Sequence, residues 1–233
     1  MRIDLPTVQG KFLRRYKRFF TDVELDSGEV ITAHCPNTGS LKTCLDVGRR
    51  AVLRDTQDPE RKLRYVFQSI QVDGTWVNVD TSLPNQATYE HVLAGSIPEL
   101  AGYSDARREV KYGENSRIDL LLTSEKGARC WVEVKNTTYA VARCAAFPDA
   151  VTERGRKHLE ELSAQVRKGD RAVQFFFVSR DDVDRFRPAV EIDPEYAAAL
   201  RRAAKCGVEL VAYAHRIGPA SLEIAHKLPI DLD

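Results

Sequence analysis

The sequence contains no apolar run of transmembrane length, and its first residues form no secretory signal. Its 35 basic residues nearly balance its 34 acidic residues, which leaves a net charge of +1 over 233 residues. Because the chain lacks general basicity, any surface that binds a polyanion has to be local. These absences predict a soluble, cytoplasmic protein with no membrane partner. The length suits one large domain or two small ones.

Cysteine is sparse, and its spacing argues against two kinds of site. No C-x-x-C pair occurs, so the sequence predicts neither a zinc site nor a disulfide framework. An odd number of cysteines in a cytoplasmic chain is expected to stay reduced and structural. The five are Cys35, Cys44, Cys130, Cys144 and Cys206.

The first third of the chain is rich in short β-type segments. Turn signals such as Asp26-Ser27-Gly28 and Asp73-Gly74 separate them. Several short strands at this spacing indicate a small barrel or sandwich, and an OB-type barrel suits about 70 residues. The expected strands are Lys11–Phe20, Asp22–Leu25, Val30–His34, Ala51–Arg54, Tyr65–Val72 and Thr75–Val79.

After Leu83 the pattern changes to alternating helices and strands. The order helix, three strands, helix, strand is that of the restriction-endonuclease-like αβββαβ core. The sequence therefore predicts a two-domain α/β (α+β) protein, with an OB-like nucleic-acid-binding barrel over residues 1–82 and a nuclease-type domain over 83–233. Its expected elements are helix Gln86–Ala94, strands Arg107–Tyr112, Arg117–Leu122 and Ala128–Lys135, helix Ala150–Lys168, strand Ala172–Val178, helix Pro194–Cys206 and strand Val208–Tyr213.

The most informative residues are two acids and a lysine on neighbouring strands. A turn at Gly113–Ser116 precedes the first strand, and a hairpin centred near Lys126 would bring Asp119 opposite Glu133. Lys135 lies two residues further, on the same face as Glu133. Acid plus acid-x-lysine on a sheet is the arrangement of metal-dependent phosphodiesterases.

Two carboxylates this close repel by roughly 4 kcal/mol at an effective dielectric near 20, so a proton or a cation must relieve them. Oxygen ligands favour Mg²⁺ or Mn²⁺, which Asp119 and Glu133 would hold, with Glu90 of the preceding helix as a further acid. Lys135 would orient the attacking water or neutralise charge on the phosphate. The alternative is an exposed cross-strand ion pair of little energetic consequence.

Several polar segments are candidates for nucleic-acid contacts. A basic and aromatic run, a loop of small polar residues followed by a lysine, the start of the second-domain sheet and the long helix each supply donors. An edge strand, a plain turn and a solvated helix face are the corresponding alternatives without a ligand. The candidates are Arg14, Arg15, Tyr16, Lys17, Arg18, His34, Asn37, Lys42, Arg117, Arg154, Lys157 and His158.

Longer motifs make the chain resemble the sugar fermentation stimulation protein family of bacteria and archaea. They are RYKRF, AHCPNTGS, LPN, IPELAGY, RREVKYGENSRIDLLL, EVKN, FPDAVTERGRKHL, FRPA and IDPEYA. The resemblance implies DNA binding without clear sequence preference, a link to sugar (maltose) utilisation, and an OB-like domain joined to a PD-(D/E)XK nuclease-like domain. Asp119, Glu133 and Lys135 match that pattern by position. Ile118 stands where a proline often precedes the aspartate, and 138–146 is expected to be a family-variable loop.

Two functions follow from these patterns. The first is a DNA-binding protein, with RNA as a possible second partner, whose Mg²⁺-dependent site cuts phosphodiester bonds. The second is a non-catalytic DNA-binding regulator of sugar metabolism whose nuclease site is vestigial. A protein–protein scaffold is a third, less favoured use of the same fold. The intact Asp119, Glu133 and Lys135 favour the first, because a lost activity usually erodes one of them.

Overall fold

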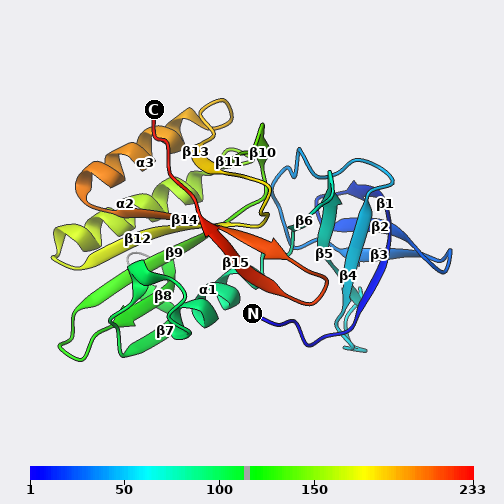
Figure 1. The fold of residues 1–233 in the computed structure, drawn as a ribbon, viewed down its shortest axis with the longest axis horizontal. Coiled ribbons are helices and arrows are strands. Elements are labelled where there is room, and N and C mark those ends of the chain that lie inside the picture. Colours follow the sequence, from blue (N-terminus) through cyan, green and yellow to red (C-terminus); the bar gives the residue numbers. More distant parts are fainter. Residues whose placement is uncertain (113–115) are drawn as a thin grey trace.

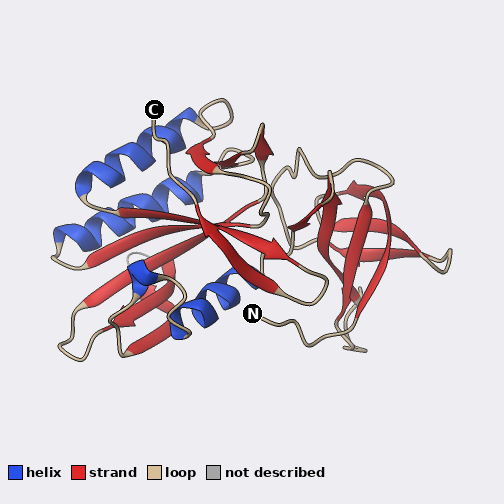
Figure 2. Cartoon of the chain, in the orientation of Figure 1, coloured by secondary structure: helices blue, strands red, loops and turns tan. Residues whose placement is uncertain are grey.

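The protein folds into two lobes that lie side by side, each built around a sheet (Figure 1). The structure is a computed structural model, and it describes residues 1–112 and 116–233. The turn expected at Gly113–Ser116 therefore falls mostly outside the described residues. Every helix of the described chain belongs to the larger lobe (Figure 2), and none of these helices is long and apolar enough to cross a membrane.

The smaller lobe is a closed β-barrel, which confirms the predicted OB-like domain. Its strands are β1 (Thr7–Tyr16), β2 (Phe20–Leu25), β3 (Val30–His34), β4 (Arg50–Asp55), β5 (Tyr65–Val72) and β6 (Thr75–Asn78). They pair in the order β3-β2-β1-β4-β5-β6, and β3 meets β5 where His34 faces Val66. Alternate side chains point inward, and Phe12 and Phe67 stack in the barrel core.

The basic segment Lys11–Phe20 is a hairpin, and its prediction as a single strand was wrong. β1 ends at Tyr16, β2 begins at Phe20, and Lys17 and Arg18 between them have positive φ angles of 48° and 63°. Two successive residues with positive φ make a tight turn that suits twisted antiparallel strands. The turn contains no Gly, Asn or Pro, the residues that usually indicate a turn in a sequence. The alternation of basic and apolar residues therefore predicted one continuous strand.

The larger lobe confirms the predicted αβββαβ order. Its elements are α1 (Leu83–Leu93), the short η1 (Pro98–Leu100), β7 (Asp105–Tyr112), β8 (Ser116–Thr123), β9 (Arg129–Thr137), β10 (Ala140–Val141), β11 (Cys144–Phe147), α2 (Glu153–Arg167), β12 (Arg171–Val178), β13 (Arg185–Pro188), α3 (Pro194–Cys206), β14 (Glu209–Ile217) and β15 (Leu222–Lys227). The main sheet has the order β15-β14-β12-β9-β8-β7. Helices α2 and α3 cover one face and α1 covers the other (Figure 1).

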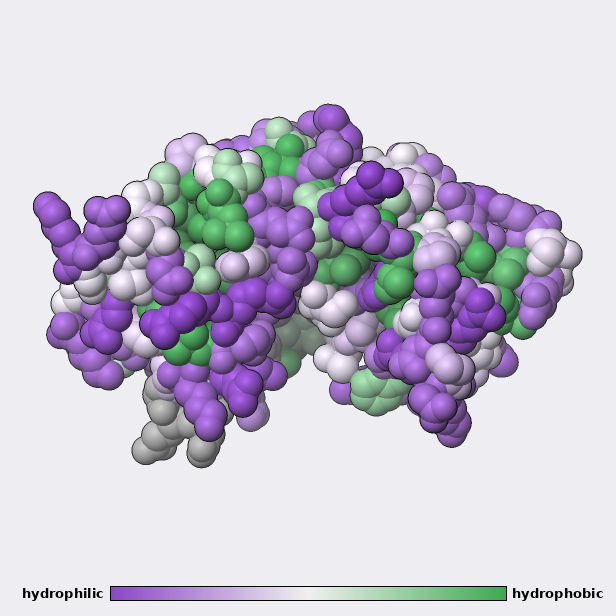
Figure 3. Space-filling view, turned by 90° about the horizontal axis from the view of Figure 1, so that it is seen from below, coloured by the Kyte–Doolittle hydropathy of each residue, from purple (hydrophilic) through white to green (hydrophobic). Residues whose placement is uncertain are grey.

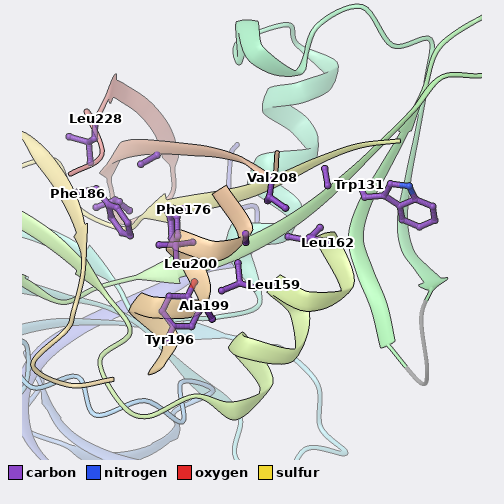
Figure 4. Close-up of a cluster of buried hydrophobic side chains, with 14 of the residues drawn as sticks. Trp131, Leu159, Leu162, Phe176, Phe186, Tyr196, Ala199, Leu200, Val208 and Leu228 are labelled. Atoms are coloured by element: carbon purple, nitrogen blue, oxygen red, sulfur yellow. The ribbon is translucent and has the colours of Figure 1, made fainter. Parts of the chain in front are cut away.

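Apolar spacing on α2 explains why this helix packs on the sheet. Leu159 and Leu162 are fully buried against Phe176 of β12 and the side chains of α3 (Figure 4). Gly155 lets α2 approach α3, since a Cβ there would lie 3.0 Å from a ring carbon of Tyr196. A glycine inside a helix destabilises that helix, and the close contact between α2 and α3 explains why one is found here.

Four strands of the larger lobe were not predicted from the sequence. β10, β11 and β13 form a separate small sheet, and β15 pairs with β14. The region expected as a variable loop, 138–146, holds β10 and most of β11. The long helix starts at Glu153 instead of Ala150 because Thr152 caps it, its Oγ1 accepting from the Gly155 N–H. β10, β11 and β13 have only two to four residues each, which is too few for a clear periodic signal.

The first residues of the chain belong physically to the larger lobe. The amino group of Met1 donates to the Leu222 carbonyl, and Ile3 is buried in the core of the larger lobe. Further contacts join the lobes: Asn78 N–H donates to Ser179 O, and Gln68 Nε2 donates to Pro219 O. The barrel strands occupy 7–78, while the boundary predicted at residue 82 stays a prediction.

Stability is expected to fall as the solution becomes acidic, because two histidines are buried together. The rings of His91 (α1) and His215 (β14) lie 5.7 Å apart. Burial lowers the pKa of His91 to about 4 and of His215 to about 3, and the carboxylates of Glu90 and Glu223 only partly offset this at His91. The neutral rings are favoured in the folded state, so their contribution is present above pH 6.5 and is lost as pH falls toward 3.

The contribution of this histidine pair to the unfolding free energy should therefore drop by a few kcal/mol between pH 6.5 and 4. Chemical denaturation across that range measures it. His215→Gln, which cannot take up a proton, should flatten the curve; a wild-type slope in that variant would rule out the histidine pair as its cause.

Candidate functional site at the junction of the lobes

The β8–β9 hairpin has the register expected from the sequence. Leu121 pairs with Trp131 and Leu120 pairs with Val132, so the hairpin is centred near Lys126. Asp119 and Glu133 are the next residues of the two strands beyond these pairs. This face of the sheet is covered, since Trp131 is only 7% exposed and belongs to the same apolar cluster as Leu159 and Leu162 of α2. A covered face that carries charges requires partners for them.

Glu133 is almost completely buried and is held by two donors on the same oxygen. Its Oε1 accepts from Lys135 Nζ at 2.6 Å and from Nδ1 of His158, while its Oε2 has no hydrogen-bond partner. Burial alone raises the pKa of this carboxyl, but Lys135 and His158 outweigh it and hold the pKa below its ordinary value. Glu133 is therefore an ionised carboxylate with one oxygen to spare.

Asp119 carries the opposite perturbation. Its Oδ2 accepts from the Val134 N–H at 2.7 Å, and its Oδ1 accepts from Asn85 Nδ2 at 2.6 Å. Burial first, and then the charge of Glu133, raise its pKa to about 7. Two neighbouring carboxyl groups in a cleft whose pKa values are pushed apart are a candidate functional site.

His158 lies beneath the surface, at 4% exposure, and not on an open binding face as the sequence suggested. Arg154 Nε donates to its Nε2 at 3.3 Å, which assigns the proton to Nδ1 and directs it at Glu133. One side of α2 packs on the sheet, so His158 is buried and orients Glu133, whereas Arg154, four residues earlier on the helix, is exposed at the surface.

The two carboxyl groups fit a hard divalent cation. Among the described residues no three His, Cys, Asp or Glu side chains converge closely enough to hold a metal by themselves. Asp119 and Glu133 would supply two ligands, the orphaned Oε2 of Glu133 among them. Mg²⁺ commonly takes one or two carboxylates and fills its shell with water and substrate phosphate, so this donor set is sufficient.

A cavity of about 780 Å³ opens between the lobes at these acids. The larger lobe contributes Asp119, Glu133, Lys135, Arg154 and the first turn of α1. The barrel contributes Arg15, Arg18, Asn37 and the loop that follows it. The space-filling view shows a notch between the lobes, on a face where hydrophilic residues predominate (Figure 3). The cavity thus combines a pair of carboxylates with cations from both lobes.

The barrel loop from Pro36 to Ser40 is fixed against the larger lobe by Asp149. Ser40 Oγ donates to the Asp149 carbonyl at 2.6 Å, and the Leu41 N–H donates to Asp149 Oδ2 at 2.9 Å. Arg15 donates to the carbonyls of Gly39 and Asn37 at 2.8 and 2.5 Å. Asp149 is therefore a contact between the lobes.

Adding a methyl group at Gly39 is expected to loosen this contact. A Cβ there would lie 2.4 Å from Asp149 Oδ1, and the Leu41 N–H holds that carboxylate in place. Gly39→Ala should lower the unfolding free energy by about 1–3 kcal/mol. Denaturation of Gly39→Ala, of Asp149→Ala and of the double variant gives a double-mutant cycle. The loss of unfolding free energy caused by Gly39→Ala should be smaller in the Asp149→Ala background. An equal loss of unfolding free energy in both backgrounds would show that the added methyl group does not act through Asp149.

Asn85 is the site residue that sequence reasoning missed. The sequence predicted a helix that starts at Gln86, which leaves Asn85 outside it, but α1 starts at Leu83 after Ser82. Asn85 therefore lies in the first turn, where its amide reaches Asp119. The Leu83-Pro84-Asn85 sequence offered a signal, because proline favours the first helical positions.

The structure places Glu90 away from the acids. Five residues after Asn85, it is rotated by about 140° around α1. Its Oε1 accepts from Gln86 Nε2, and it does not line the cavity. The expected third acid of the metal site is therefore not brought to the other two.

The remaining candidates divide into two groups. Arg117 and Lys157 line a second cavity of about 550 Å³ on the other side of the acids. Arg14 is paired with Asp22 at 2.7 Å, and Tyr16 stacks on a neighbouring ring of its own hairpin. In the described part of the chain, the candidates outside both cavities are Arg14, Tyr16, Lys17, His34 and Lys42.

Comparison with known proteins agrees with this architecture. The family model described as "Sugar fermentation stimulation protein RE domain" matches residues 82–221, and "SfsA N-terminal OB domain" matches 13–79. The chain is 48% identical to the sugar fermentation stimulation protein homolog of Geotalea uraniireducens over 99% of both chains. It is also 48% identical to that of Geobacter sulfurreducens over 97% of this chain and 96% of the relative. The solved structure of Pyrococcus furiosus SfsA in complex with Ca²⁺ is 29% identical, with a TM-score of 0.89 over 99% of this chain and 98% of that one.

Proposed function

This chain belongs to the sugar fermentation stimulation protein family, and we propose that it is a divalent-metal-dependent phosphodiesterase that binds and cuts DNA. The observation that carries the proposal is a pair of neighbouring carboxyl groups, of which Glu133 is buried and Asp119 is partly buried. Asp119 has a pKa raised to about 7 beside an ionised Glu133 whose Oε2 lacks a partner, and both line a cavity with cations. The Ca²⁺ in the related Pyrococcus furiosus structure supports a divalent cation for this family.

Asp119 and Glu133 would hold Mg²⁺ or Mn²⁺, which when bound polarises a phosphoryl group and lowers the pKa of water. The protein itself supplies orientation and charge. Asn85 and the Val134 N–H fix the carboxylate of Asp119, and His158 fixes that of Glu133. Lys135 Nζ, at 2.6 Å from Glu133, would steady an attacking water or neutralise charge on the phosphate.

DNA is the substrate class that fits the surroundings. Arg15 and Arg18 approach from the barrel, and Arg154 approaches from α2. Such donors bind phosphate oxygens, which position a nucleic acid without reading its bases. In a chain with a net charge of +1, these cations make the local surface that the sequence required. We therefore propose binding with little sequence preference.

The test is cleavage by the purified full chain. Single-stranded and double-stranded DNA are incubated with Mg²⁺, with Mn²⁺, or with EDTA, and products are resolved on denaturing gels. We expect cleavage with Mg²⁺ or Mn²⁺ and none with EDTA. DNA binding without cleavage under any of these conditions would overturn the catalytic proposal and favour a DNA-binding regulator of sugar metabolism with a vestigial site.

A further inference from the structure

The acid site lies in the middle of a hollow and not at its end. Two cavities, of about 780 and 550 Å³, meet there and share four wall residues. The shared residues are Asn85, Asp119, Arg154 and His158. One cavity extends from this point toward the barrel and the other extends along the start of α2. We call these two cavities the barrel arm and the helix arm.

Each arm carries its own cations. In the barrel arm, the carbonyls of Asn37 and Gly39 hold the guanidinium of Arg15, and Arg18 lies at the tip of the β1–β2 hairpin. This hairpin corresponds to the first loop of an OB barrel, a loop with which such folds bind oligonucleotides.

In the helix arm, Arg117 at the start of β8 and Lys157 on α2 are exposed. Glu109 is the only acid of this arm besides Asp119 among the described residues. Lys157 Nζ lies 3.8 Å from Glu161, but half of its side chain remains accessible. Both ends of the hollow therefore offer positive charge to a polyanion.

We propose that one nucleic-acid strand runs through both arms, so that the protein cuts internal phosphodiester bonds and requires no strand end. This inference rests on the proposed function. An enzyme that removes terminal nucleotides must stop the strand just beyond the reacting phosphate. Here the hollow continues past Asp119, and cations line the continuation. Phosphates on both sides of the scissile bond then have partners.

Covalently closed circular DNA tests the proposal directly, because it has no ends. Wild-type protein with Mn²⁺ or Mg²⁺ is given a single-stranded circle, a relaxed duplex circle, and linear single-stranded and duplex forms of the same sequences. We expect at least one circle to be cut at a rate within about threefold of its linear form; the first product is full-length linear DNA from the single-stranded circle and a nicked circle from the duplex. Intact circles beside linear DNA that shortens from its ends would overturn the inference while leaving the phosphodiesterase proposal standing.

A binding experiment separates the two proposals if no substrate is cut. The affinity of a single-stranded 15-mer is measured in EDTA for Arg18→Ala and Arg117→Ala, one from each arm. Each variant should weaken binding severalfold and reduce the slope of log affinity against log salt by about one unit. Arg14→Ala is the matched control, since Arg14 belongs to the same hairpin but is paired with Asp22 outside the hollow. Losses confined to one arm would overturn the inference.

Discussion

Substitution of Glu133 by glutamine is expected to slow DNA cleavage by about 10²–10³-fold or more. The side chain keeps its shape, and an amide oxygen can still accept from Lys135 and His158. The negative charge that would hold the cation disappears together with the second carboxylate oxygen, the one that has no partner. DNA affinity measured in EDTA should stay within about twofold, because phosphate contacts come from the cations of the two arms.

Single-turnover rates measure the loss of cleavage, and fluorescence anisotropy with labelled DNA measures binding. Glu125→Gln is a matched control, since Glu125 is exposed in the turn of the same β8–β9 hairpin. Thermal unfolding verifies that the Glu133 variant is folded. A variant that cuts DNA within tenfold of the wild type would remove Glu133 from the metal site.

Substitution of Asp119 by asparagine is expected to stabilise the metal-free protein above neutral pH. The pKa of Asp119 is about 7 in the folded chain against an ordinary value of 3.8, so folding favours its neutral form. The wild-type unfolding free energy is therefore highest below pH 3.8 with respect to this group, and it falls as pH rises toward and through 7. Asparagine is permanently neutral. Its oxygen can keep the Val134 N–H, while the amide of Asn85 turns to offer its own oxygen.

At pH 8 in EDTA, Asp119→Asn should unfold at a free energy on the order of 2–4 kcal/mol above that of the wild type. Adding Mg²⁺ at 100 times its dissociation constant should stabilise the wild type by roughly 2.7 kcal/mol and leave the variant unchanged. Urea denaturation at pH 5 and pH 8, with and without the ion, measures both effects. Asp105→Asn, at the exposed end of β7, is the control. Equal stabilisation of variant and wild type by Mg²⁺ would show that the ion binds elsewhere.

Local patterns in the sequence were enough for the architecture and for the core of the site. Period-two alternation and a turn near Lys126 determine which residues of a two-stranded hairpin face each other. Asp119 and Glu133 are only 14 residues apart, by the difference of their numbers. The order of helices and strands then located that hairpin within a known kind of core, because long periodic segments carry a strong signal.

Contacts between segments that are far apart in the sequence could not be predicted from these local patterns. Leu41 and Asp149 are separated by 108 residues, and nothing in either segment indicates that they meet. For the same reason the sequence did not reveal the role of Asn85, and it predicted His158 on an open face. It also predicted Glu90 as a metal ligand, although α1 directs Glu90 away from the other two acids. Helix rotation and burial depend on which side packs against the sheet.

By itself, the sequence determined that two carboxylates and a lysine converge on neighbouring strands of an αβββαβ domain that follows a barrel. Only the tertiary structure decided that the barrel faces those carboxylates across a cavity, which oxygen of Glu133 lacks a partner, and that the hollow continues on both sides of the acids. The physical reason is one of range. Strand alternation and hairpin register act between near neighbours along the chain, whereas the placement of the lobes depends on the packing of residues that the chain brings together only when it folds.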